Sequence, residues 1–145
     1  MESLIVVLVV GLAGGIAVGL QGPLTSLMSQ RLGTMESVFI VHIGGALLAG
    51  IALLAARGGN LGAWRGVPWY ALAAGSLGLV VLSAVSYTIP RIGVATTVTL
   101  IVVAQLITAA LLDHFGLLGA SVRLLDPSRL LGIAVLFVGT WLIMR

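Results

Sequence analysis

Long apolar stretches separated by short polar segments dominate the hydrophobic pattern of the chain. A helix needs about 20 mostly apolar residues to cross the hydrocarbon core of a bilayer. Five stretches come near or exceed that length, at residues 4–32, 35–56, 68–89, 94–112 and 128–144. We therefore predict an all-α membrane protein with five transmembrane helices, which form a single transmembrane domain over residues 1–145.

The connecting segments carry residues that start or end helices. Arg57-Gly58-Gly59-Asn60 predicts the end of the second helix, and Pro90-Arg91-Ile92-Gly93 predicts a tight turn into the fourth. Asp126-Pro127-Ser128 is typical of a helix start. The first stretch is too long for one upright crossing, so we expect a tilt or a kink near Pro23.

The composition supports a bilayer environment. Hydrophobic residues make up 60% of the chain and charged residues only 8%, whereas soluble domains typically have about 45–50% and about 25%. The chain has no cysteine, and its arginines stand singly between apolar runs, which is typical of anchors at lipid headgroups and not of a nucleic-acid interface. No metal-ligand motif, cofactor motif or catalytic pair is evident. We expect no metal, no cofactor and no enzymatic activity.

The arginines give almost no signal for orientation. Five crossings would place Arg57, Arg65, Arg123 and Arg129 on the side of the N-terminus, and Arg31, Arg91 and Arg145 on the other side. An excess of positive charge normally marks the cytoplasmic side. Two interpretations follow: a subtler feature fixes one orientation, or the chain inserts in both orientations and forms an antiparallel homodimer.

Polar residues inside apolar stretches are candidates for function, because burying them in hydrocarbon is costly. Gln21, Thr25 and Ser29 recur every fourth residue on one face of the first helix, and either line a cavity or hydrogen-bond between helices. The full set of candidate substrate-binding residues is Gln21, Thr25, Ser29, His42, Tyr87, Thr97 and Gln105.

Two residues of the second helix could couple transport to ion movement. His42 can titrate near neutral pH, although a single histidine is also a common packing residue. Glu36 lies near the helix start and reaches either the headgroups or a cavity. On the first helix, Gly11, Gly15 and Gly19 form a stripe of small residues that predicts close helix packing.

Two strings of residues resemble a known family. Tyr87-Thr88-Ile89-Pro90-Arg91-Ile92-Gly93-Val94-Ala95 and Asp113-His114-Phe115-Gly116-Leu117-Leu118-Gly119, with Gln105 between them, resemble the YdcZ family of small five-helix bacterial inner-membrane proteins. That family looks like a branch of the drug/metabolite transporter superfamily. The resemblance implies an inner-membrane location and antiparallel two-fold assemblies.

A second resemblance concerns residues 21–33 and the later Tyr-x-x-Pro stretch, which look like the small multidrug resistance transporters. Those proteins carry a membrane-embedded glutamate, and the corresponding position here is Gln21, which does not titrate. The departure argues against proton-coupled cation export through that residue. Tyr87 falls near the substrate-contacting tyrosine of those transporters, so the resemblance implies that role for it.

These observations favour a secondary transporter that works by alternating access as an antiparallel dimer. The polar, uncharged candidate residues suggest a small polar or weakly charged metabolite or drug as substrate. The alternative is a membrane assembly subunit without transport activity, or a passive channel. Polarity begins only at Gln21 in the first helix, which favours a closed cavity at mid-membrane over a continuous pore.

Overall fold

The computed structural model describes residues 4–145, and this part of the chain is helical without any strand. It divides into two compact units, Met1–Pro90 and Arg91–Arg145. Each unit is described by itself below. The all-α character predicted from the sequence is confirmed for the described residues.

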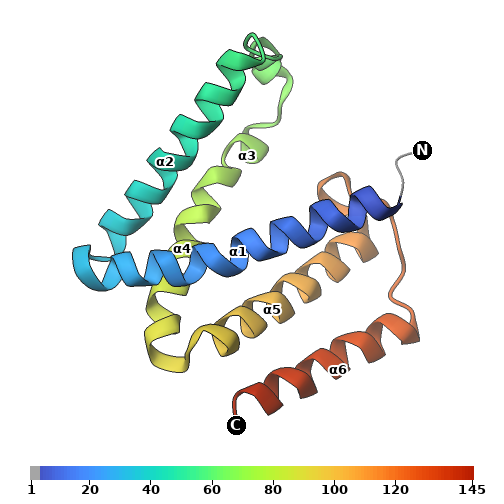
Figure 1. Cartoon of the computed structure of the whole chain (residues 1–145). Coiled ribbons are helices and arrows are strands. Elements are labelled where there is room, and N and C mark those ends of the chain that lie inside the picture. The colour runs from blue at the N-terminus through green and yellow to red at the C-terminus, as the bar shows by residue number, and fades with distance from the viewer. Residues whose placement is uncertain (1–3) are drawn as a thin grey trace. The chain divides into compact units, whose positions relative to one another are not determined.

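The first unit is built on two long helices joined by a tight turn. α1 (Leu4–Leu32) continues through Pro23, and α2 (Thr34–Ala55) begins after the single residue Gly33 and packs against α1 (Figure 1). A short 3-10 helix, η1 (Leu61–Gly66), follows α2. The third predicted helix forms in two pieces, α3 (Trp69–Leu72) and α4 (Ala74–Ile92).

The second unit is a pair of helices. α5 (Val94–Phe115) and α6 (Pro127–Ile143) lie side by side, joined by the short 3-10 helix η2 (Leu117–Gly119) and an extended loop (Figure 1). Asp126 caps α6, since its carboxylate accepts hydrogen bonds from Ser128 Oγ (2.6 Å) and Arg129 N (2.8 Å). These bonds, led by that of Ser128, lower the pKa of Asp126.

Within residues 4–145, four helical stretches are long and apolar enough to span a membrane: Leu4–Leu32, Thr34–Ala55, Trp69–Ile92 and Val94–Phe115. α6 is apolar but has only 17 residues. At about 1.5 Å per residue it is roughly 25 Å long, which is less than the roughly 30 Å of the hydrocarbon core. The chain is therefore a multi-pass membrane protein with four clear candidate spans, and a fifth crossing by α6 remains a prediction.

Two turns have backbone conformations that only glycine adopts readily. Gly33, between α1 and α2, has φ 109° and ψ 156°, and Gly93, before α5, has φ 80° and ψ 167°. Each glycine carbonyl accepts the first hydrogen bond of the following helix, from Ser37 N (3.1 Å) and Thr97 N (3.2 Å). A helix therefore ends and the next begins within one residue, which leaves little unpaired backbone at the turn.

The sequences around these two turns share a pattern. Ser26, Arg31, Gly33 and Ser37 recur 60 residues later as Ser86, Arg91, Gly93 and Thr97. Ser26, Ser37, Ser86 and Thr97 are all buried. The chain thus makes the same kind of helix-glycine-helix turn twice, with an arginine two residues before each glycine.

Burial in this chain is the reverse of that in a soluble protein. Most large apolar side chains are exposed, and the buried side chains include few apolar ones. The buried polar side chains are those of Thr25, Ser26, Ser37, Ser86, Thr97 and Thr140, and the buried apolar ones are those of Val38, Leu82, Val85 and Val103. Helices that pack through small residues and direct leucine, valine and isoleucine outward are suited to lipid.

Asp113 and His114 order the loop between α5 and α6. The Asp113 carbonyl accepts a hydrogen bond from Arg123 N at 2.9 Å, and His114 Nδ1 accepts one from Leu125 N at 3.2 Å. Gly116 ends α5 in the left-handed region with φ 61°. Asp113 thus contacts the backbone of Arg123, whereas its side chain pairs with that of Arg129 at 3.5 Å.

We predict that Gly33→Ala destabilises the protein. A Cβ at Gly33 would overlap the Glu36 carboxylate, and the backbone conformation there is nearly exclusive to glycine. The unfolding free energy should fall by about 1–3 kcal/mol, as measured by denaturant titration with circular dichroism in detergent. Gly44→Ala is the control, because nothing lies within 4 Å of a Cβ at that position. Equal stability of the two variants would contradict the role given to the turn.

Candidate functional site

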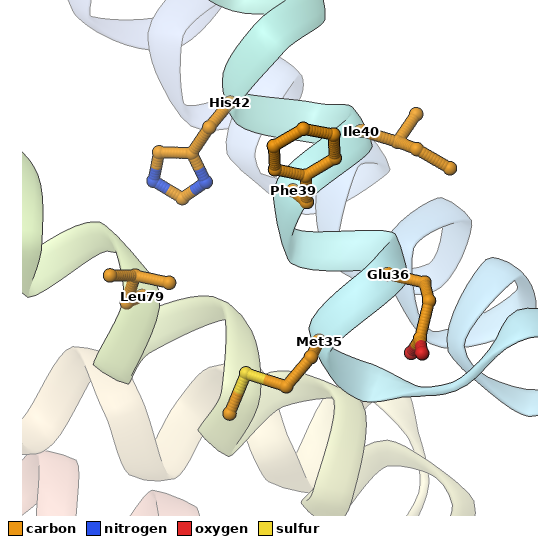
Figure 2. A pocket seen from close by; sticks show the side chains of 6 residues that line it. All are labelled: Met35, Glu36, Phe39, Ile40, His42 and Leu79. Carbon is orange, nitrogen blue, oxygen red and sulfur yellow. The ribbon is translucent and has the colours of Figure 1, made fainter.

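The main candidate site is a pair of adjoining hollows formed by α2 and α4, with a contribution from α1. The larger is open, has a volume of about 800 Å³ and is lined by Met35, Glu36, Phe39, Ile40, His42 and Leu79 (Figure 2). The smaller has a volume of about 430 Å³ and is lined by Gln21, Val41, His42, Gly45, Ala46, Gly78, Val81 and Leu82. His42 lines both hollows and therefore stands between them.

One bond and one close contact set the orientation of His42. Its Nδ1 lies 2.8 Å from the carbonyl of Val38, one turn earlier in α2. A carbonyl only accepts, so Nδ1 carries the proton and Nε2 is the acceptor of the neutral ring. Nε2 lies against Gly78 of α4, where a Cβ would be only 2.7 Å away. The absence of a side chain at Gly78 therefore leaves room for the imidazole between α2 and α4.

Gln21 is the second polar group of the smaller hollow. It lies on α1, and its amide can both donate and accept hydrogen bonds. Gly45, Ala46 and Gly78 contribute little side-chain volume, so they leave space beside Gln21 and His42. The structure thus brings together two residues that are 21 positions apart in the sequence and that the sequence analysis selected independently.

Glu36 lines the larger hollow and also belongs to the Gly33 turn. Its carboxylate folds back over Gly33, at the start of α2, where the helix dipole favours negative charge. Figure 2 shows that the Glu36 carboxylate and the His42 imidazole point in different directions. Glu36 thus combines a position in the first turn of α2 with a place in the lining of the larger hollow, and its predicted role stays a prediction.

The other two candidate residues of α1 hydrogen-bond locally. Thr25 is buried, and its hydroxyl donates to the Gln21 carbonyl at 2.8 Å. Ser29 Oγ lies 3.0 Å from Thr34 Oγ1 across the Gly33 turn. Neither residue lines the two hollows. The structure therefore gives Thr25 and Ser29 packing contacts and places only Gln21 of this face at the hollow.

The remaining candidates lie elsewhere. Tyr87 is on α4, 60% exposed and outside the two hollows. Thr97 and Gln105 are on α5 of the second unit, where Thr97 is buried and its hydroxyl has no hydrogen-bond partner among the described residues. The glycine stripe at Gly11, Gly15 and Gly19 has open space within 4 Å of each Cβ position. The predicted roles of all these residues stay predictions.

The apolar part of the site was not predicted from the sequence. Met35, Phe39 and Leu79 form much of the wall of the larger hollow. A search for polar residues inside apolar stretches cannot select them, because they look like lipid-facing residues. Their spacing offers a weak signal, since Met35, Phe39 and His42 recur every three or four residues and so share one face of α2.

We also compared the chain with known proteins. Residues 6–142 match the family described as "Putative inner membrane exporter, YdcZ". Searches among curated proteins and among solved structures give no match. The family match covers nearly the whole chain, so it applies to both structural units.

The helices and the family match together define a multi-pass protein of the inner membrane, of the general class of transporters. The chain belongs to the YdcZ family. The predicted family and location are thereby confirmed, and the two strings around Pro90 and Asp113 correctly indicated the family.

We predict that Gly78→Ala displaces the His42 ring. The chain has two histidines, so His114→Gln leaves His42 as the only imidazole, and its ¹⁵N resonances can be read by NMR in labelled protein. Gly78→Ala should shift them, because the new methyl group would lie 2.7 Å from Nε2. Gly75→Ala, with open space around its Cβ position on the same helix, should not. Unchanged resonances in Gly78→Ala would contradict the contact described here.

Proposed function

We propose that this chain is one half of an antiparallel dimeric transporter that moves a small polar or weakly charged solute by alternating access. The observation that carries the proposal is the convergence of Gln21 and His42 on one hollow in a chain of the exporter family. Transporters commonly bind substrate at the interface of inverted repeats near mid-membrane. An antiparallel pair of chains would supply such repeats.

The chemistry of the hollow supports an uncharged or weakly charged substrate. Gln21 and His42 can exchange hydrogen bonds with hydroxyl, amide or carboxyl groups, while Phe39, Met35 and Leu79 provide apolar contact. His42 is the titratable group shared by both hollows, so we propose it as the coupling residue. Glu36, which lines the larger hollow, is the second candidate for that role. We propose no catalytic step and no bound metal or cofactor.

The antiparallel arrangement draws on the arginine distribution. The assumed five crossings give four arginines on one side and three on the other, so the charge bias that normally fixes orientation is nearly absent. α6 is shorter than the hydrocarbon core is thick. A locally thinned bilayer, or packing against a second copy of the chain, would let it cross the membrane. We propose dual topology on this basis, and drug/metabolite transporter superfamily membership on the resemblance of the YdcZ family to that superfamily.

The second candidate function is a non-transporting assembly subunit or a passive channel. The openness of the larger hollow and the wide exposure of apolar side chains would suit a subunit that binds other membrane helices. A structural subunit has no need for Gln21 and His42 to meet at a hollow. A transporter must bind its solute and exchange it across the membrane, whereas an assembly subunit or a passive channel need not.

We predict that Gln21→Ala lowers transport by about tenfold or more, which corresponds to one lost hydrogen bond to the solute. Proteoliposomes containing the wild-type chain would be screened with radiolabelled amino acids, organic acids, polyols and quaternary amines. The variant would then be tested on the solute that is transported. Gln30→Ala is the matched control, because Gln30 is on the same helix and outside both hollows. Wild-type rates in Gln21→Ala would remove the site assignment.

Counterflow separates a carrier from a channel in the same vesicles. Vesicles loaded with unlabelled solute should transiently accumulate the labelled solute above its external concentration, because an alternating site exchanges one molecule for another. A channel gives equilibration without accumulation, and an assembly subunit gives no flux above empty liposomes. Either of these results would overturn the transporter proposal.

We predict that both termini can be labelled from both sides of the membrane. The chain lacks cysteine, so one cysteine placed at either end reports orientation through an impermeant maleimide in intact and permeabilised cells. Dual topology predicts partial labelling of each terminus in intact cells. Labelling of each terminus from one side only would exclude an antiparallel homodimer and require a partner of opposite orientation.

A further inference from the structure

The second unit contains a groove that none of the functions above uses. It runs between α5 and α6, has a volume of about 320 Å³, and is walled by Leu106, Ala109, Ala110, Gly132, Ile133 and Leu136. Its two charged lining residues are Asp113, from the last turn of α5, and Arg129, from the first turn of α6. The groove is thus apolar along its length, with one acid and one base at one end.

The charged end is held in place by the surrounding backbone. The carbonyl of Asp113 accepts from Arg123 N, and Arg129 N donates to Asp126 Oδ1, which fixes both residues at helix ends. Asp113 Oδ2 and Arg129 Nη1 are 3.5 Å apart, and these side chains are 37% and 32% exposed. The ion pair is therefore long and partly exposed, so each side chain can bind a further group of opposite charge.

We propose that this groove binds a phospholipid with an ethanolamine headgroup. The phosphate would pair with Arg129 and the primary ammonium with Asp113, while one acyl chain would lie along the apolar walls. The charges at the rim favour a zwitterion over an anionic lipid, because the Asp113 carboxylate repels a second negative charge. A quaternary choline group cannot donate a hydrogen bond to Asp113, so it fits less well.

The membrane context supports a lipid as the occupant. α5 is long and apolar enough to span the bilayer, and its charged last turn then falls near the headgroups. Ala109, Ala110 and Gly132 leave the space between the helices open, and nothing lies within 4 Å of a Cβ position at Gly132. A lipid chain fills such a seam without any conformational change in the protein.

The test is native mass spectrometry of delipidated full-length protein in detergent, titrated with phosphatidylethanolamine, phosphatidylcholine and phosphatidylglycerol of identical acyl chains. The ethanolamine lipid should bind most tightly. Arg129→Gln should weaken it about tenfold or more, as expected for one lost charge-assisted hydrogen bond. Gly132→Leu should weaken all three lipids by filling the groove. Arg57→Gln and Gly75→Leu are the matched controls outside the groove.

Four results would overturn the proposal. Equal binding of the three lipids would remove the headgroup assignment, and unchanged binding in both groove variants would remove the groove. Equally tight binding of glycerophosphoethanolamine, which has no acyl chains, would leave the apolar walls without a role. Loss of dimer in Gly132→Leu with lipid binding intact would show that a second copy of the chain occupies the groove. Circular dichroism of each variant verifies that it is folded.

Discussion

The need to pair every backbone N–H and C=O group within lipid governs this structure. Hydrocarbon supplies no hydrogen-bond partners, so the chain has to be helical wherever it meets lipid, and its turns must be short or lie at the headgroups. The Gly33 turn meets this demand with one residue between two helices. Its positive φ lets the glycine carbonyl accept the first bond of α2 while α1 ends.

The same constraint explains why polar side chains lie inside and apolar ones outside. Small hydroxyl residues such as Thr25 and Ser37 satisfy their own backbone, with bonds to the carbonyls of Gln21 and Thr34, and so can be buried between helices. Gln21 and His42 differ, because both line the smaller hollow, and Nε2 of His42 reaches the space that the missing side chain of Gly78 leaves. Polar groups of this kind can hydrogen-bond to a solute.

Much of the fold could be predicted from the sequence because helix length and hydropathy are local properties. The start of α6 follows from Asp126 and Pro127, which were predicted to begin a helix, whereas the role of Gly33 in the turn before α2 was not predicted. The break between α3 and α4 was missed, since Leu72-Ala73-Ala74 carries no helix-ending residue. The family was recognised correctly because its strings are specific.

The site could be predicted only in part, because proximity between helices is not a local property. Periodicity put Gln21, Thr25 and Ser29 on one face, but only contacts with α2 and α4 show that Gln21 alone reaches the hollow. Gly78 gave no chemical signal, yet it makes room for His42. His42 and Gln105 belong to different units. Whether both contact the same solute is a question for transport measurements on variants of each.

The central claim is that the hollow beside Gln21 and His42 is a water-accessible solute site. The most direct measurement is the rate at which a water-soluble maleimide labels single cysteines in membranes. Gly45→Cys lies in the hollow, whereas Leu47→Cys is on the same helix, 63% exposed and outside the hollow. Fast labelling at position 45, slowed by the transported solute, and slow labelling at position 47 are the predicted results. Equally slow labelling at both positions would mean that lipid fills the hollow, and would contradict the account.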